Sequence, residues 1–486
     1  MLILSNLTNY NGYRGGHSED LEDVLGNFLL NIETELNIEH CDPEFLGIWF
    51  RLRQIVSDYI IDMMISKESD DKLESNKNIL DSPSKKKRLN FRSSVFKSLI
   101  FLNPFLTIKR NKILIFTNSR RVIDSSDGCF EDLYTEPLYK YIGDDEACLI
   151  EEPWFNNHFT PIRYKVKHGD GLLYLSYFLG ILSYRPLRKD TLAKIRFIED
   201  EIATTFQINI NIRKFAKRTW LKRKGALQAY KLLFLWLKPR LIIYTALNTD
   251  SAMVEAAKFM GFPVAELQHG ILGQHVSFDN QVFREIQPDY LLIFGKFWSD
   301  EQAKIGRREV VVGFEYLNEK RKLYPLHKEK QIFIISDGNL EMSKLAVNLA
   351  KLHLDYRVVF KLKPTEFLTW EDKYPGLYHS QISGAIEVVS SSDISNYELL
   401  SRSEFQVGGC SMLLFEGIAF GCKTVVIRGS GFRYLKGLIS KGYAISGEYS
   451  GGFDLSSAPE VDTAEIEHLF DSNTALHFGN FLKNLK

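Results

Sequence analysis

The sequence predicts an α/β protein with two doubly wound parallel sheets and an extra helical N-terminal region. Short runs rich in Val and Ile alternate with helical patterns, and this alternation occurs twice, on either side of the charged stretch 318–330. Runs that are apolar throughout predict parallel strands covered on both faces. Apolar residues at helical spacing over 20–64 predict helices before them. We therefore expect a helical region with a linker and a basic segment (1–110) and two α/β domains (111–317 and 318–486).

The elements follow in order along the chain. Residues 20–64 predict two or three helices, and the polar stretch 66–84 predicts a linker. In the first domain we expect a helix at 251–260 and strands at 112–118, 147–152, 239–247, 263–267, 290–295 and 309–314. In the second we expect helices ending near 353, starting near 395 and at 411–420, with strands at 331–338, 356–364, 385–391, 404–409 and 423–429. Ligands of such sheets bind at the carboxyl ends of strands, here in a cleft between the two sheets.

Composition limits the function classes. With 45% hydrophobic and 25% charged residues, the chain is not expected to be disordered over most of its length. Equal numbers of basic and acidic residues, 61 each, disfavour a bulk nucleic-acid binder. The five cysteines form no CxxC pair, so we expect neither a structural zinc site nor a disulfide scaffold, and a reducing compartment. We also expect no signal peptide and no membrane-spanning helix.

Residues 85–121 combine positive charge with an apolar stretch. The span holds 11 lysines and arginines and no acidic residue, and it encloses SLIFLNPFLTI. Such a segment suits an anionic membrane surface, and the alternative is a solvated basic loop beside a buried segment. A second basic cluster at 214–224 surrounds Trp220. We expect a cytoplasmic protein with a peripheral contact at the inner face of the cell membrane.

Gln268-His269-Gly270 directly follows the predicted strand 263–267. Histidine titrates near neutral pH, so on a strand-end loop it can take a proton from a hydroxyl group. We interpret His269 as the candidate general base, with Gln268 and Gly270 supporting the loop. The alternative is a histidine that is satisfied by a backbone carbonyl.

Lysines end a predicted strand of the second domain. Lys361 and Lys363 close the strand 356–364, and Pro364 stiffens the turn. A fixed positive charge on a stiff loop suits a phosphate or pyrophosphate. The alternative is a solvated basic turn.

A third loop leads into the predicted helix 411–420. Gly409, Cys410 and Ser411 precede it, and backbone N–H groups at a helix N-terminus favour an anion. Glu416 lies on the helix and can accept hydrogen bonds from ribose hydroxyls. The alternative for Glu416 is a surface carboxylate.

Taken in order, these loops resemble the sites of GT-B glycosyltransferases that assemble bacterial surface polysaccharides. The similarity covers roughly residues 235–430 and is to polysialyltransferases, to sialic-acid or Kdo transferases that use CMP-sugars, and to glycerophosphotransferases that use CDP-glycerol. It implies two Rossmann-like domains that face a cleft, with His269 as the base. It further implies that the donor phosphate is held by Lys361, Lys363, Gly409, Cys410 and Ser411, and that Glu416 and Pro364 border the ribose or base.

The same resemblance implies the reaction. A sugar from a nucleotide-activated donor, of the CMP-Kdo or CMP-sialic acid type, would pass with inversion to a surface-glycan or lipid-linked glycan acceptor. We expect no metal and no cofactor, because the sequence has no Asp-x-Asp motif and a lysine with a helix N-terminus supplies the countercharge. Glu151, Glu152 and Asn248 are candidate acceptor contacts by strand-end position.

Two positions depart from the pattern of those families. Lys363 stands where His is usual, and Ser411 is single where a Ser pair is common. Three alternatives stay open: a CDP-glycerol glycerophosphotransferase, an enzyme like the non-hydrolysing UDP-N-acetylglucosamine 2-epimerases, or a non-catalytic GT-B partner subunit. The Gly408-Gly409 turn and Glu416 echo the epimerases. Nucleic-acid binding through the basic clusters is a further alternative.

Overall fold

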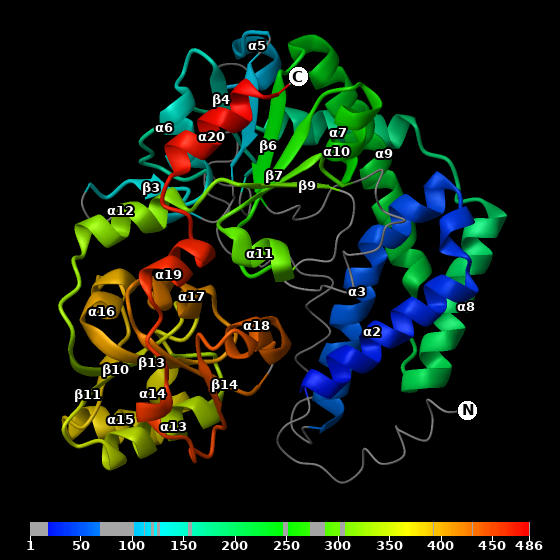
Figure 1. Cartoon of the computed structure of the whole chain (residues 1–486). Helices are drawn as coiled ribbons and strands as arrows, with labels where there is room; N and C mark the ends of the chain where they lie inside the picture. The colour runs from blue at the N-terminus through cyan, green and yellow to red at the C-terminus, as the bar shows by residue number, and fades with distance from the viewer. Residues whose placement is uncertain are drawn as a thin grey trace.

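Two parallel sheets organise the computed structural model, which describes residues 18–68, 102–110, 112–117, 121–123, 127–153, 158–245, 251–272, 287–301, 307–391, 393–429 and 431–485. The strand order is β5-β4-β1-β6-β7-β8-β9 in the first sheet and β12-β11-β10-β13-β14-β15 in the second (Figure 1). Each sheet starts at an inner strand and winds first to one side and then to the other. The predicted pair of Rossmann-like, doubly wound domains is therefore confirmed, with switch points between β1 and β6 and between β10 and β13.

The predicted strands are present. The first sheet contains β1 (Ile113–Phe116), β4 (Ala147–Glu151), β5 (Val166–His168), β6 (Leu241–Thr245), β7 (Val264–Leu267), β8 (Tyr290–Ile293) and β9 (Arg308–Val311). The second contains β10 (Glu329–Ile335), β11 (Arg357–Lys361), β12 (Glu387–Val389), β13 (Ser403–Gly408), β14 (Lys423–Ile427) and β15 (Ile445–Gly447). A separate antiparallel ribbon pairs β2 (Val122–Ile123) with β3 (Phe130–Glu131). The sequence did not predict β5 and β15, because their residues, VKH and ISG, do not form an apolar run.

Helices connect the strands. The first half of the chain has α2 (Ser18–Glu35), η2 (Ile38–His40), α3 (Pro43–Glu68), α5 (Pro104–Thr107), α6 (Thr135–Ile142), α7 (Asp170–Leu182), α8 (Lys189–Phe206), α9 (Ile212–Leu237), α10 (Ser251–Phe259) and α11 (Lys296–Glu301). The second half has α12 (Glu315–Leu323), α13 (Leu340–Leu352), α14 (Trp370–Lys373), α15 (Pro375–Ile382), α16 (Asn396–Arg402), α17 (Met412–Ala419), η5 (Phe432–Leu435), α18 (Lys436–Ser440), η6 (Leu455–Ser457), α19 (Thr463–Leu469) and α20 (Thr474–Lys483).

The predicted linker 318–330 is partly wrong, because α12 occupies its first residues. Tyr316 and Leu317 are buried on one side of this helix, while its last turn is basic. Burial of that short apolar face stabilises a helix that the charged composition concealed.

Both faces of the first sheet are covered, as the alternation along β1 shows. Leu114 and Phe116 pack in a cluster with residues of α7, α9 and α10. Ile113 and Ile115 pack on the opposite face with residues of α6 and α20. The C-terminal helix α20 therefore returns to the first sheet, where Figure 1 shows it beside α6.

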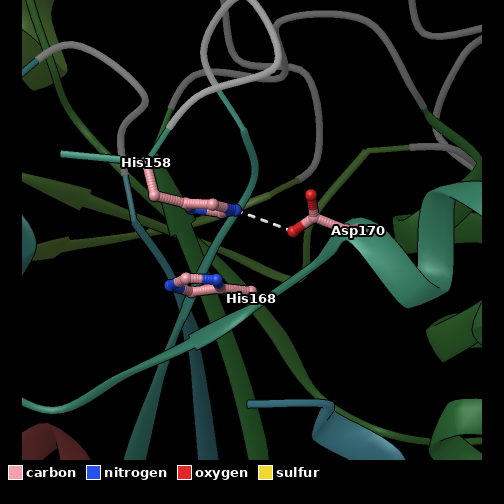
Figure 2. Close-up of side chains that lie close together, drawn as sticks. All are labelled: His158, His168 and Asp170. Carbon is pink, nitrogen blue, oxygen red and sulfur yellow. Dashed lines mark hydrogen bonds and ion pairs between the residues drawn. The ribbon is translucent and has the colours of Figure 1, made fainter. Parts of the chain in front are cut away.

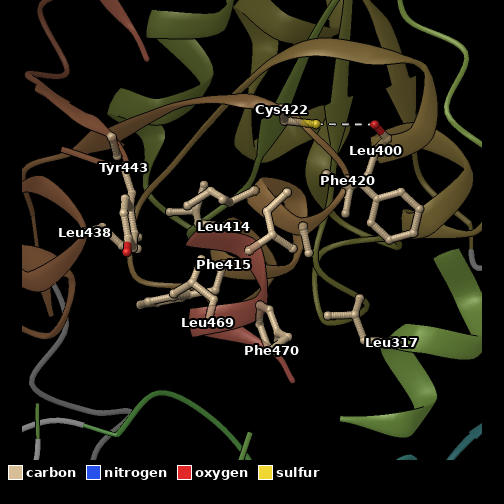
Figure 3. Packing of buried hydrophobic residues seen from close by; sticks show 14 of the residues in the cluster. Leu317, Leu400, Leu414, Phe415, Phe420, Cys422, Leu438, Tyr443, Leu469 and Phe470 are labelled. Carbon is tan, nitrogen blue, oxygen red and sulfur yellow. Dashed lines mark hydrogen bonds between the residues drawn. The ribbon is translucent and has the colours of Figure 1, made fainter. Parts of the chain in front are cut away.

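The two halves share a hydrophobic cluster, seen in Figure 3. Trp298 of α11 is fully buried and packs against Phe415 of α17, with ring centroids 4.7 Å apart. Its indole N–H donates to the carbonyl of Leu469 at the end of α19, at 2.9 Å. This cluster fixes the end of the first sheet against the helices of the second.

The N-terminal helices form a lobe with later segments. Residues of α2 and α3 share one core with α8 and the first turns of α9. Inside it, Glu33 pairs with Arg53 and accepts a hydrogen bond from the Trp49 indole at 2.9 Å. The predicted domain boundaries at 110 and 317 stay predictions. Most of the predicted linker 66–84 and of the basic segment 85–121 lies outside the described residues. Among the described helices, none has the length and apolar character needed to cross a membrane.

Candidate active site

The second sheet brings two loops together at its switch point. Asp337 follows β10 and Gly409 follows β13, and a Cβ atom added at Gly409 would lie only 3.2 Å from the Asp337 carboxylate. The Tyr449 hydroxyl donates to Asp337 Oδ2 at 2.6 Å. The predicted glycine turn therefore lies at the position in the sheet where ligands of doubly wound folds bind.

Lys363 is anchored beside this switch point. Its exposed ammonium donates to the carbonyl of Asp337 at 2.7 Å, and its backbone N–H donates to Glu366 Oε2 at 2.8 Å. Burial would raise the pKa of Glu366, but hydrogen bonds from Tyr374, Lys363 and Ser336 outweigh burial and lower it. The loop that carries Lys363 and the exposed Pro364 is therefore held by an ionised, buried carboxylate.

Lys361 has a structural task in this structure. Its ammonium donates to the carbonyls of Ser391 and Ile394, at 2.6 and 3.2 Å. Partial burial lowers its pKa. Lys361 therefore ties the end of β11 to the loop after β12, a role that the sequence pattern did not indicate.

Ser411 caps the helix that the sequence placed here. Its hydroxyl oxygen accepts from the backbone N–H of Leu413 at 3.2 Å, which makes it the N-cap of α17. Cys410 is exposed and lies against Gly431, where a Cβ atom would come within 2.8 Å of the Cys410 sulfur. The positive φ of 78° at Gly431 also favours glycine.

Glu416 is buried, so the surface-carboxylate alternative is wrong. Burial raises the pKa of Glu416 to about 7, and a hydrogen bond with Tyr397 opposes that rise only in part. Near neutral pH this carboxyl group therefore exchanges between its charged and neutral forms.

The His269 loop is held by its buried neighbour. The Gln268 amide accepts from the backbone N–H of Phe294 and donates to the carbonyl of Gly270, both at 2.9 Å. His269 itself is exposed and contacts the ring of Tyr134 edge to face, with centroids 6.5 Å apart. Gln268 thus joins the ends of β7 and β8 and presents His269 outward.

A chain of aromatic rings connects this loop to Glu416. Centroid distances are 5.6 Å from Tyr134 to Phe314, 6.2 Å from Phe314 to Tyr316 and 5.8 Å from Tyr316 to Tyr397. Tyr397 then bonds Glu416. These rings belong to or border the hydrophobic cluster that the two halves share. Residues next to His269 and residues of the first turn of α17 also pack against that cluster: Ile271, Leu272, Met412 and Leu413. Residues beside His269 and residues of the first turn of α17 thus pack against one hydrophobic cluster to which both halves contribute. The predicted cleft stays a prediction, since two pockets of the described residues lie elsewhere, beside β11 and β12 and beside β8 and α20.

A buried polar cluster at the ends of β4 and β5 was not predicted as a unit. Both ring nitrogens of His158 form hydrogen bonds with carboxylates, Nδ1 with Glu151 Oε1 at 2.9 Å and Nε2 with Asp170 Oδ2 at 2.7 Å. Figure 2 shows its ring above that of His168, and the centroids are 3.5 Å apart at an interplanar angle of 11°. Arg121 pairs with the second oxygen of Glu151 at 3.2 Å. Of the candidates taken from strand-end position, only Glu151 belongs to this cluster, because the two histidines show no sequence pattern. Glu152 instead accepts a hydrogen bond from the Tyr230 hydroxyl at 3.1 Å, and Asn248 lies outside the described residues.

The two histidines have opposite pKa shifts. Burial alone would lower the pKa of His158, but its hydrogen bonds to Asp170 and Glu151 raise it to about 9. Burial and the neighbouring charge of His158 lower the pKa of His168 to about 4. At neutral pH a cationic ring therefore stacks on a neutral one, between two carboxylates.

These residues also contain metal-binding donor types. One ligand atom each from His158, His168 and Asp170 lies within 4.8 Å of the others. However, both nitrogens of His158 already face carboxylates, and lone pairs in two nearly parallel rings do not converge on one point. A bound ion would have to replace the His158 proton and tilt a ring. The expectation of a metal-independent enzyme stays a prediction.

The chain matches no family model, and it matches no curated protein. Among solved structures it is similar to UDP-GlcNAc 2-epimerase from Neisseria meningitidis bound to UDP-GlcNAc, with 12% identity over 77% of this chain and 100% of that one and a TM-score of 0.44. It is also similar to Acinetobacter baumannii MurG, with 12% identity over 76% of this chain and 94% of that one and a TM-score of 0.41. A third similar structure is the glycosyltransferase SnogD from Streptomyces nogalater, with 13% identity over 78% of this chain and 96% of that one and a TM-score of 0.39. At such scores we take the fold from the chain's own sheet order, which is that of two Rossmann-like domains.

Proposed function

We propose that this protein is a nucleotide-sugar glycosyltransferase, with the donor on the second α/β half and the acceptor on the first. The observation that supports this most is that residues beside His269 and residues of the first turn of α17 pack against one hydrophobic cluster to which both halves contribute. The two halves then carry a general base and an anion-binding helix start on either side of one shared core.

The charges near the switch point support a phosphate ester as the donor group. Lys363 and the N-terminus of α17 are positive, while the carboxylate of Asp337 lies against Gly409. Positive groups at this turn stabilise a bound phosphate. We take the CMP-sugar of the Kdo or sialic acid type from the sequence resemblance.

The proposed reaction is a single displacement. His269 takes the proton of the acceptor hydroxyl, whose oxygen forms a bond to the anomeric carbon. The bond between that carbon and the phosphate oxygen breaks, and its electron pair leaves with the nucleotide. Lys363 and the α17 N-terminus stabilise the developing negative charge. One displacement inverts the anomeric configuration.

A metal-free thermal unfolding screen with CMP, CDP, UDP and GDP tests the donor class. A ligand at about 100 times its Kd stabilises the folded state by about 2.7 kcal/mol, which a melting curve resolves. We expect stabilisation by CMP. Stabilisation by UDP alone would instead favour a UDP-sugar transferase or an epimerase-like enzyme. CDP alone would favour a glycerophosphotransferase, and stabilisation by none of the four would favour a non-catalytic subunit.

His269→Ala tests the base. We expect turnover to fall by about 10²–10⁴-fold while stabilisation by the nucleotide persists. His379→Ala, at an exposed histidine of α15, is the matched control. Unchanged turnover in His269→Ala would exclude His269 as the base.

A further inference from the structure

Helix α7 exposes an apolar face. Apart from Asp170 at its start, the helix sequence DGLLYLSYFLGIL contains no charged residue. Tyr177, Phe178 and Leu182 are 65%, 58% and 67% exposed. Three further exposed apolar residues share the helix, and one follows it: Leu173, Tyr174, Ile181 and Tyr184. We call these seven residues the α7 face.

Helix α7 packs closely on α9 on the side opposite the α7 face. A Cβ atom added at Gly225 of α9 would lie 1.8 Å from the carbonyl oxygen of Ser176, and one at Gly180 would lie 2.7 Å from that of Leu221. The backbones of α7 and α9 are therefore in close contact. Because the two helices cannot approach further, α9 cannot cover the outward-facing side chains of α7.

Neighbouring elements add apolar and aromatic surface. Trp236 at the end of α9 is half exposed, and its indole N–H donates to the carbonyl of Phe105 in α5 at 2.9 Å. Asn103, the N-cap of α5, lies within 3.0 Å of a Cβ atom added at Gly171 in α7. Leu106 of α5 is 69% exposed. The start of α7, α5 and the end of α9 are thus neighbours.

Basic residues lie at both ends of this surface. Beyond α7 the chain continues through exposed Arg185, Arg188 and Lys189. At the other end, exposed Lys109 and Arg110 follow α5, and the Arg110 guanidinium lies 5.0 Å from the centre of the Trp236 ring. Helix α9 carries eight lysines and arginines, of which Arg223 is buried and pairs with Glu255 and Arg213 pairs with Glu199.

We propose that the α7 face docks on an anionic lipid bilayer. Tyr and Trp combine an apolar ring with a polar tip, and flanking Lys and Arg meet the lipid phosphates. At 13 residues α7 is too short to span a bilayer, so it lies along the surface. This surface differs from the segment 85–121 that the sequence suggested, and the proposal does not rest on the transfer reaction.

Flotation of the purified chain with vesicles tests the proposal. We expect binding to phosphatidylcholine vesicles that contain phosphatidylglycerol, weaker binding at high salt, and much weaker binding to phosphatidylcholine alone. The triple variant Tyr177→Ser/Phe178→Ser/Leu182→Ser should lower the partition constant at least about tenfold. The control is Leu352→Ser/Leu354→Ser/Leu368→Ser, at three exposed leucines of the second half, which should bind like the parent.

A charge variant keeps the test independent of the apolar side chains. Arg185→Glu/Lys189→Glu should weaken binding to anionic vesicles about fivefold or more per residue and reduce the salt dependence. Equal binding by parent and α7 variant would overturn the proposal. The proposal would also be overturned if the parent does not bind vesicles but forms a dimer, seen by light scattering, that the α7 variant dissociates. A second copy of the chain would then cover this face.

Discussion

His158 gives the sharpest prediction, because both of its nitrogens face carboxylates inside the protein. Its pKa rises from 6.5 to about 9, and its side chain is only 6% exposed. A group with a raised pKa binds its proton more tightly in the folded state. The resulting stability is fully present below pH 6.5 and is lost as the pH rises through about 9.

The magnitude follows from the shift. A difference of about 2.5 pKa units corresponds to about 3 kcal/mol, and most of it should be lost between pH 7 and 9. Other histidines and carboxyls with shifted pKa values titrate mainly below this window: His168 near 4, and Glu136 and Glu416 near 7. The raised pKa values of Cys41, Cys148 and Cys422 add a loss of stability as the pH approaches 9, so the difference between the parent and a His158 variant is what isolates His158.

Equilibrium urea unfolding at pH 7, 8 and 9 measures the effect. The parent should lose about 2 kcal/mol more over this range than His158→Gln, which is itself less stable at pH 7 because two carboxylates lose a cationic partner. His379→Gln, at an exposed histidine, should keep the parent slope. Equal slopes for the parent and His158→Gln would refute the reasoning.

Three further predictions concern packing and the site. Gln268→Leu leaves the Phe294 N–H without its buried acceptor, so we expect the free energy of unfolding in urea to fall by about 1–3 kcal/mol and the turnover number to fall. If neither quantity changed, the role of this amide would be contradicted. Gly225→Ala should cost about 3 kcal/mol by forcing α7 from α9, whereas Gly376→Ala, a helical glycine with open space around it, should be neutral or stabilising. Glu416→Gln should be about 2 kcal/mol more stable than the parent at pH 8 but not at pH 4.5. The parent loses stability as the pH rises from 4.5 through about 7, because the unfolded carboxyl group releases its proton at lower pH than the folded one. The same variant should weaken nucleotide stabilisation if Glu416 serves the donor.

Local sequence patterns predicted much of the fold. Apolar runs at 241–245 and 264–267 became β6 and β7, and the Gly409 to Ser411 turn became a capped helix start. Strand ends, glycines and caps act within a few residues, so a sequence shows them directly.

The remaining features depend on contacts between distant segments. The sequence of α7 has the composition of a buried helix, and only its packing on α9 shows that most of its apolar residues face outward. Lys361 has the sequence position of a phosphate ligand, but in the folded chain its ammonium group donates hydrogen bonds to two carbonyls some 30 residues away. The sequence alone thus determined which residues stand at the ends of the strands. Tertiary structure decided which of them are buried, paired or exposed, because desolvation and hydrogen bonding depend on neighbours that the chain brings together only when folded.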